Sequence, residues 1–371
     1  MPHTTALQTG SNAAAKGVLI RTLPLITAVL CTVLAATACS TDRSTSTSTS
    51  TSTSTSKEKP SSAATVPGTA PALTQAQARD AIAHYSKTNN LAHAEPDRTL
   101  LSTVESGPRL AMSLADLKEN EGLPKADRTP YRPWSYDLAS TDLYIPRLRE
   151  GQERWFAAVT RAGSEKQYAR VLVMAENASS KRWEMVATVD LDDPGQLPQV
   201  VLDENGYATA VDASSASLTA PVGVLRSAVG DNFVTGGKRS GKKVFAPSES
   251  SRRQIKIHDE AVRKFGPRGT VRFASPRPEF ADAYALKTAT GALVVFSHTH
   301  TQHDRATAPG LRIMPEAPDR AWLGTTPSPA FSYTFTCSDV AAVPASPGPS
   351  DLLGYGCRRT HAEAVGPSTA V

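Results

Sequence analysis

The sequence lacks an apolar run long enough to stay in a membrane as a helix. Residues 23–38 are almost wholly apolar, but Pro24 interrupts them, and a helix that crosses the hydrocarbon core needs about 20 apolar residues. Lys16 and Arg21 precede the run without an acidic residue, and small residues end it. This layout is typical of a secretory signal that is cleaved after export. We therefore predict a signal peptide over residues 1–38.

Cysteine is also scarce, with four in 371 residues, and one of them directly follows the predicted signal. Residues 34–40 read Leu-Ala-Ala-Thr-Ala-Cys-Ser, which resembles the bacterial lipobox, where small residues lead into an obligatory cysteine. Ala36 departs from that pattern, which prefers a larger aliphatic residue. The resemblance implies that Cys39 receives a diacylglyceryl thioether and anchors the chain to the extracytoplasmic face of the cell membrane, since each buried methylene contributes about 0.8 kcal/mol. An ordinary secreted protein cleaved near Ala38 is the alternative.

Two cysteines remain for the folded part of the chain, because Cys31 leaves with the signal and Cys39 carries lipid. An exported protein with two such thiols is expected to pair them. We therefore predict a disulfide between Cys337 and Cys357, which would stabilise the fold by about 3 kcal/mol by restricting the unfolded chain. A catalytic or metal-binding thiol at either position is the alternative.

Residues 39–72 are poor in side chains that a fold could bury. Serine and threonine alternate over residues 44–56, and the bias toward Ser, Thr, Ala and Pro continues to Pro71. Nothing there offsets the entropy of ordering the chain, so we predict a disordered tether that begins at the lipidated Cys39. A flexible chain of some thirty residues spans about 30 Å, which is enough to lift the following body off the lipid headgroups.

The body opens with helix signals and continues with strand signals. Thr74 and Gln77 form a capping box before apolar residues at helical spacing, which predicts a helix from residue 75 to the low nineties. Asp97 can cap a second short helix, and Pro108 can start a third. Helices followed by an antiparallel sheet form the α+β layout, with the helices packed on one face of a curved sheet. The predicted strands cover residues 155–161, 168–175, 183–191, 199–202 and 207–211.

The second half of the body repeats this pattern more loosely. Residues 155–173 pass from an aromatic strand through a glycine-containing turn to an aliphatic strand, and residues 283–296 do the same. Aromatic and polar residues alternate over residues 331–337 and predict the last clear strand. We predict two α+β modules, residues 73–215 and 216–371, which a diverged tandem repeat would explain.

Several of these features together resemble an actinobacterial extracytoplasmic lipoprotein family of unknown function. They are the lipobox, the Ser/Thr tether, an Arg-rich and Ala-rich composition, and the segments Tyr-Ser-Lys-Thr-Asn-Asn at 85–90 and Leu-Leu-Ser-Thr-Val-Glu-Ser-Gly-Pro at 100–108. The resemblance transfers no catalytic residue. More distantly, helices that precede a bent sheet resemble the roll of nuclear-transport-factor-2-like domains, which implies a concave pocket in a fold that hosts both enzymes and binding modules.

Basic residues are concentrated in one segment. Residues 236–277 hold twelve Lys or Arg against three acidic residues, a net charge of +9, whereas the whole sequence carries +5. Such a segment could contact anionic phospholipid or an anionic envelope polymer, at about 1 kcal/mol per basic residue near a charged surface. A solvated face balanced by acidic residues elsewhere is the alternative, and nucleic acid is not an expected partner outside the cell. The candidate contact residues are Lys238, Arg239, Lys242, Lys243, Arg252 and Arg253.

A histidine cluster suggests a metal site. His298 and His300 are alternate residues of a predicted strand and therefore share a face, and a turn could bring His303 and Asp304 beside them. Imidazole ligands suit zinc or copper, so the three histidines are candidate ligands. The alternative interpretation is that these polar residues mark the end of the strand, where the chain leaves the sheet. We predict no cofactor.

Signatures of catalysis are scarce. Residues 236–242 have the glycine and lysine spacing of a phosphate-binding loop, but Lys243 stands where a magnesium-binding Ser or Thr is needed, so a basic turn is the expectation. Ser240 with Lys243 lacks the supporting motifs of penicillin-recognising enzymes. Asp190 and Asp192 imitate the start of a calcium loop without its bidentate Glu. The sequence has no Gly-x-Ser-x-Gly elbow, and we assign no Ser-His-Asp triad.

These features favour a non-enzymatic module at the cell surface, which binds a ligand, an envelope polymer or another envelope protein. The second hypothesis is an envelope hydrolase or a metal-dependent enzyme whose residues are dispersed through the fold, and the histidine cluster motivates it. A purely structural lipoprotein that faces the cell wall is the third. The aromatic-rich residues 131–155 are expected to fill a core rather than to bind glycans or peptides.

Overall fold

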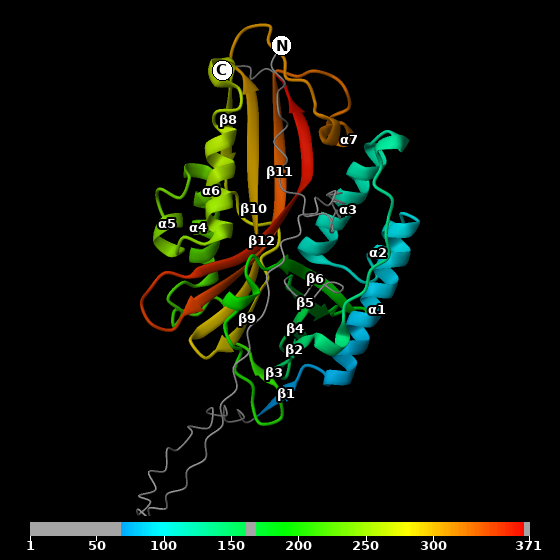
Figure 1. Ribbon diagram of the computed structural model, residues 1–371, viewed down its shortest axis with the longest axis vertical. Helices are drawn as coiled ribbons and strands as arrows, with labels where there is room; N and C mark the ends of the chain where they lie inside the picture. The colour runs from blue at the N-terminus through cyan, green and yellow to red at the C-terminus, as the bar shows by residue number, and fades with distance from the viewer. Residues whose placement is uncertain (1–67, 161–167, 367–371) are drawn as a thin grey trace, which may run out of the picture. The chain divides into compact units, whose positions relative to one another are not determined.

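The structure, a computed structural model, describes residues 68–160 and 168–366. The predicted signal peptide, the predicted lipidation site Cys39 and most of the predicted tether lie outside the described residues. The described residues form seven α-helices and three sheets, so the prediction of a mixed α+β fold is confirmed (Figure 1). None of the helices within these two ranges is both long enough and apolar enough to cross a bilayer.

The first three helices begin where the sequence predicts them. Thr74 accepts a hydrogen bond from the backbone of Gln77, whose side chain accepts one from the backbone of Thr74, so the capping box starts α1 (Gln75–Ala94). An aspartate side chain caps α2 (Arg98–Leu101). A proline occupies the first turn of α3 (Gly107–Gly122), where its missing N–H costs nothing.

A four-stranded antiparallel sheet follows, in the order β2-β4-β5-β6. The predicted hairpin is β4 paired with β5, and its turn lies outside the described residues. All six residues of β4 are buried, which is typical of a strand covered on both faces. The strands are β2 (Asp142–Tyr144), β4 (Trp155–Thr160), β5 (Arg170–Glu176) and β6 (Trp183–Asp190).

A small sheet of three short strands differs from the predicted pairing. β1 (Thr69–Pro71) pairs with β3 (Pro146–Arg149), which pairs in parallel with β7 (Ala208–Thr209). The hairpin predicted between residues 199–202 and 207–211 reduces to one bridge, from Leu202 to Ala208. Its outer residues, Val200 and Ala210, bridge instead to β9 (Ala283–Thr288).

The second half forms a five-stranded antiparallel sheet in the order β12-β11-β10-β8, and β9 also pairs with β10. β10 and β11 pair over fifteen residues, and Figure 1 shows them as long arrows beside β12. The predicted strand 331–337 is therefore the first half of a longer strand. The new strands are β8 (Gly269–Ala274), β10 (Gly291–Ala306), β11 (Ala330–Pro344) and β12 (Asp351–Val365).

The sequence analysis did not predict three helices: α4 (Val222–Thr235), α5 (Gly241–Val244) and α6 (Glu249–Ala261). α4 and α6 pack against this sheet, and α5 packs against α4. α4 follows Pro221 without a side-chain cap and is buried around most of its surface, so it shows neither a cap signal nor an amphipathic stripe. α6 starts with a capping box made by two serines, Ser248 and Ser251. The remaining helical segments are α7 (Arg320–Leu323), η1 (Lys125–Asp127), η2 (Leu138–Ser140), η3 (Pro194–Gln196), η4 (Gly266–Arg268) and η5 (Ala317–Asp319).

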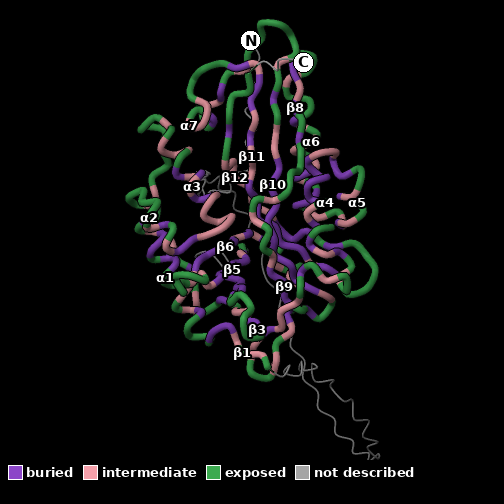
Figure 2. The backbone as a smooth tube through the Cα atoms, turned by 180° about the vertical axis from the view of Figure 1, so that it is seen from behind, coloured by how far each residue is buried: buried purple, intermediate pink, exposed green. Residues whose placement is uncertain are grey.

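Two hydrophobic clusters lie on the two faces of the second sheet. Leu293 and Val295 join a cluster with α1 and the first sheet, whereas Val294 and Phe296 join a cluster with α4. Alternate residues of a strand point to opposite faces, so the consecutive buried residues 292–300 show that this part of β10 is covered on both faces, and Figure 2 colours buried residues purple. The first cluster contains residues from both predicted modules. The boundary between the modules and the tandem repeat stay predictions.

Candidate functional site

A pocket of about 350 Å³ lies between the two larger sheets. It is bounded by the start of α3, by β5 and β6, and by β9, β10 and β11. This volume falls in the range of small-molecule sites, about 300–1,000 Å³. The apolar part of its wall includes Val186, Phe280, Tyr284, Val295 and Phe296.

Four carboxylates line this pocket, which we call the acidic pocket: Glu153, Glu176, Glu184 and Asp282. Glu176 is neutralised by Arg154, whose Nη1 lies 2.6 Å from its Oε1. The hydroxyl of Tyr284 donates to Glu153 at 3.3 Å. Burial and, after it, the charge of Asp282 raise the pKa of Glu153, and the bond from Tyr284 offsets part of this rise. The wall therefore favours a positive charge.

Two buried polar atoms of this wall have no hydrogen-bond partner among the described residues. Glu184 is 2% exposed; Asn177 donates to its Oε2 at 3.1 Å, but its Oε1 has no such donor. Nη2 of Arg182 lies 3.8 Å from that Oε1, beyond hydrogen-bond distance. Oγ of the fully buried Ser338 is likewise unpartnered. Leaving such groups unsatisfied costs about 1–3 kcal/mol each, which a bound ligand could recover.

A second pocket, of about 420 Å³, adjoins the acidic pocket and shares Glu153 and Tyr284 with it. Arg147 and Asp203 in its wall form an ion pair at 2.5 Å. Because these two charges neutralise each other, the second pocket attracts a charged ligand less strongly than the acidic pocket does.

The residues of the acidic pocket were missed in the sequence analysis. They come from strands far apart in the chain, so no local motif joins them. One signal was present: Glu184 stands in an otherwise mostly apolar strand, where five of eight residues are buried. A single carboxylate at an inward position of such a strand indicates a site, because burying it without a partner is costly.

The structure corrects the interpretation of the histidines. His298 and His300 lie in the middle of β10 and are 2% and 3% exposed, so the predicted polar exit at a strand end is wrong. β10 continues because β11 runs beside it through residue 305. His303 is exposed and, by alternation, lies on the opposite face of β10, so no turn brings it beside the other two.

The two buried histidines lie beside the predicted disulfide, which the structure contains between Cys337 and Cys357. Nε2 of His298 is 3.3 Å from Nδ1 of His300, which is 3.7 Å from Sγ of Cys337. Nδ1 of His298 is 2.5 Å from a carboxylate oxygen of Asp339. We call His298, His300, Cys337 and Cys357 the histidine–cysteine cluster.

Apolar rings surround His300. Phe233 of α4 stacks on it with ring centroids 4.0 Å apart, and Phe335 of β11 stacks on it at 4.9 Å. Burial and, after it, the proximity of His298 lower the pKa of His300 well below its ordinary value, so this imidazole is neutral at physiological pH. A neutral imidazole is the form that ligates metals.

The basic segment is exposed, but part of its charge is paired. Arg253 forms ion pairs with Asp192 at 2.8 Å and with Glu249 at 3.7 Å, so it is not available to an external anion. Contact with a membrane or an envelope polymer stays a prediction. The exposed members are Lys238, Arg239, Lys242, Lys243 and Arg252.

The loop with phosphate-binding spacing is closed on an internal carboxylate. The backbone N–H groups of Arg239, Ser240 and Gly241 donate to Oδ2 of Asp231 at 2.9, 2.8 and 3.0 Å. Thr235 donates to its Oδ1 at 2.6 Å. The N–H groups that could hold a phosphate are therefore already occupied. The calcium-like aspartates are also paired, Asp190 with Arg170 at 2.6 Å and Asp192 with Arg253 at 2.8 Å.

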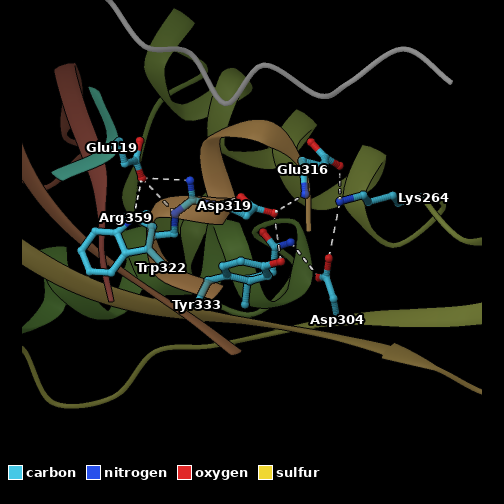
Figure 3. A network of polar contacts seen from close by, with 9 residues as sticks. Glu119, Lys264, Asp304, Glu316, Asp319, Trp322, Tyr333 and Arg359 are labelled. Carbon is cyan, nitrogen blue, oxygen red and sulfur yellow. Dashed lines mark hydrogen bonds and ion pairs between the residues drawn. The ribbon is translucent and has the colours of Figure 1, made fainter. Parts of the chain in front are cut away.

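A polar network fastens residues 313–323 to the second sheet (Figure 3). Tyr333 of β11 donates to Asp319 at 3.3 Å, and Arg359 of β12 forms ion pairs with Asp319 and, at 2.9 Å, with Glu119 of α3. Trp322 donates to the same Glu119 at 2.9 Å. Because these partners satisfy one another, the network is structural and links α3 to the sheet.

Lys264 extends this network on the other side, as Figure 3 shows. Its Nζ lies 3.5 Å from Asp304 and 3.2 Å from Glu316. Burial raises the pKa of Asp304, and Lys264 offsets part of the rise. The sequence analysis grouped Asp304 with the candidate metal-binding histidines. In the structure it is instead a partner of Lys264.

Comparison with known proteins places the chain in a family. A family model described as Domain of unknown function (DUF8094) matches residues 69–364. The chain belongs to this family. An uncharacterized lipoprotein of Streptomyces coelicolor is 52% identical over 344 residues, which cover 92% of this chain and 94% of the relative. A second uncharacterized lipoprotein of the same organism is 27% identical over 168 residues, which cover 45% of this chain and 50% of the relative.

Membership in this family agrees with the predicted relationship to actinobacterial lipoproteins of unknown function. No solved structure matches the chain. The likeness to nuclear-transport-factor-2-like rolls therefore stays a prediction.

Proposed function

We propose that this protein is a lipid-anchored lipoprotein on the extracytoplasmic face of the cell membrane, which binds a small cationic ligand in the acidic pocket. The lipobox-like residues before Cys39 and the lipoprotein names of both relatives support the anchor. The buried, unpartnered Oε1 of Glu184 carries the binding role.

The charge of the pocket selects the ligand. Arg154 pairs with Glu176, and Arg182 lies 3.8 Å from Glu184 without donating a hydrogen bond to it, but Glu153 and Asp282 bring further negative charge, and no Lys or Arg is among the described lining residues. An ammonium group beside Glu184 would make a charge-assisted hydrogen bond of about 1.5–3 kcal/mol. Cations between buried carboxylates also gain because the local dielectric is low.

The apolar wall selects the rest of the ligand. Phe280 and Val295 stand with Tyr284 on the side of the second sheet, and aromatic faces attract cations as well as alkyl or aryl groups. The expected ligand is therefore an amine or quaternary ammonium with an apolar body, small enough for about 350 Å³.

Binding is favoured over hydrolysis by the position of the histidines. His298 and His300 lie on the face of β10 that meets α4, and no histidine is among the described residues that line the acidic pocket. The carboxylates and serines of the pocket thus lack an imidazole base within it. The envelope hydrolase stays the alternative hypothesis.

We expect Glu184→Gln to weaken binding of cationic ligands by about 10–100-fold, because it removes a buried charge-assisted hydrogen bond without changing the side-chain shape. The measurement is calorimetric titration of the full chain with a panel of aryl- and alkylammonium compounds. Each compound is paired with its uncharged alcohol, which should bind weakly to both forms.

Glu204→Gln is the matched control, because Glu204 is an exposed carboxylate of a turn; it should bind the amines as the natural chain does. The proposal fails if no ammonium compound of the panel binds, or if Glu184→Gln binds them equally well. Affinity should also fall on acidification, and at a higher pH than an ordinary glutamate would dictate, because the raised pKa of Glu153 lets it take up a proton early.

The anchor is tested separately with Cys39→Ser. Serine cannot form the thioether, so we expect the chain to leave the membrane fraction and appear in the extracellular medium. Fractionation of cells that express either form, followed by detection of the chain, measures this. A Cys39→Ser chain that stays with the membrane as firmly as the natural chain would contradict lipid anchoring, whereas Cys31→Ser should change nothing.

A further inference from the structure

We propose that the histidine–cysteine cluster is a zinc site that the disulfide closes and that reduction of the disulfide opens. One donor atom from each of His298, His300, Cys337 and Cys357 lies within 4.8 Å of the others. Two imidazole nitrogens and two thiolate sulfurs form a common tetrahedral set for Zn²⁺.

The register of three strands brings these donors together. His298 of β10 is opposite Cys337 of β11, which is opposite Cys357 of β12. His300 follows two residues after His298 and so shares its face. The four side chains thus come from neighbouring positions of a paired sheet and need no backbone rearrangement to converge.

The distances between donors fit a tetrahedral ion. With Zn–N near 2.0–2.1 Å and Zn–S near 2.3 Å, neighbouring donors stand about 3.3–3.8 Å apart. Nε2 of His298 is 3.3 Å from Nδ1 of His300, and that Nδ1 is 3.7 Å from Sγ of Cys337. The remaining step is separation of the two sulfurs, which breaking their bond allows.

The surroundings are those of a metal ligand. Asp339, which is fully buried, accepts the Nδ1 proton of His298 at 2.5 Å and so leaves the Nε2 lone pair toward the other donors. Metal-ligating histidines commonly donate their second nitrogen to a carboxylate in this way. Phe233 and Phe335 stack on His300 and exclude water from it.

Opening requires an external dithiol as reductant. Cys357 lies on the edge strand β12 and is partly exposed, so a thiolate can attack its Sγ and release Cys337 as a thiolate. The second thiol of the reductant then displaces Cys357. Two electrons and two protons pass from the dithiol, which becomes a disulfide, to the two cysteines. Zinc binding displaces the two thiol protons and leaves two Zn–S bonds.

The test measures zinc bound by the purified full chain before and after reduction with a phosphine. We expect no bound zinc in the oxidised chain and one zinc per chain after reduction, with cobalt(II) giving the strong visible bands of tetrahedral thiolate coordination. Asp339→Asn should weaken zinc binding by about 10–100-fold, because it acts through the orientation of His298.

His303→Ala is the control, since His303 is an exposed histidine of the same strand; it should bind zinc as the natural chain does. The proposal is overturned if the oxidised chain binds as much zinc as the reduced chain, or if, after reduction, His298→Ala binds as much zinc as His303→Ala. A reduced chain that stays folded but binds no zinc also overturns it. Circular dichroism shows whether reduction unfolds the chain. If it does, recovery of the folded spectrum on addition of zinc supports the site, and failure to recover it overturns the proposal.

Discussion

Replacing Arg109 by methionine is expected to lower the free energy of unfolding by about 3 kcal/mol, among the largest effects of any single substitution in this chain. Glu105 is fully buried, and Nε of Arg109 donates to its Oε1 at 2.9 Å. Tyr85 and Asn89 of α1 donate to the same oxygen at 2.9 and 3.0 Å. Without the guanidinium, two neutral donors would have to hold a buried anion.

The same contacts explain why the effect spreads through the fold. Arg109 belongs to α3 and also donates to Thr188 of β6 at 3.3 Å, while Glu105 bridges to β6 through its backbone at Met185. The charge pair therefore ties α1, α3 and the first sheet together. Because 23% of the Arg109 side chain is exposed, water can partly solvate the charge that the substitution leaves unpaired. We therefore expect a loss of unfolding free energy at the lower end of the range for buried ion pairs.

Urea unfolding of the natural chain and the variant measures this loss. Arg98→Met is the matched control, because Arg98 pairs with Glu121 at the surface, where an ion pair contributes about 0–1 kcal/mol. The double variant with Glu105→Gln should recover part of the stability, since it removes the stranded charge. A cost of Arg109→Met no larger than that of Arg98→Met would show that the buried pair does not hold the fold.

The parts of the fold that the sequence predicts are those with local signals. The capping box at Thr74 sets the start of α1, and alternation of aromatic residues marks β11. The disulfide followed from the count of cysteines in a chain that is predicted to be exported. In each case the cause lies within a few residues, or in the small number of available partners.

The parts that could not be predicted depend on contacts distant in the sequence. α4 is buried on most sides by the second sheet and by α6, so its residues show no amphipathic period. His298 seemed to end a strand because polar residues begin there, but the length of β10 is set by its pairing with β11. The acidic pocket combines Glu153, Glu184 and Ser338, which no spacing rule relates.

Replacing Asp231 by alanine is the second large effect that we expect, at about 2–4 kcal/mol. Asp231 is 8% exposed, and its carboxylate accepts three backbone N–H groups of residues 239–241 and the hydroxyl of Thr235. Alanine would leave these donors unsatisfied, and that of the buried Gly241 would be the most costly. Asp259→Ala, which removes an exposed carboxylate of α6, should cost less than about 0.5 kcal/mol.

The pH dependence distinguishes this role from simple packing. Burial alone would raise the pKa of Asp231, but the hydrogen bonds from Gly241, Thr235, Ser240 and Arg239 outweigh it and lower the pKa. An acid with a lowered folded pKa stabilises the fold above its unfolded pKa, near 3.9, and loses that contribution as the pH falls through the folded value.

The stability gap between the natural chain and Asp231→Ala should therefore be constant near neutral pH and shrink below about pH 4. Urea unfolding across this range measures the gap, and hydrogen exchange of the amides at 239–241 reports the loop directly, since these amides should exchange faster in the variant alone. A gap that persists unchanged into acid would assign the loss to packing, because only the ionised carboxylate can hold the three N–H groups of the loop together.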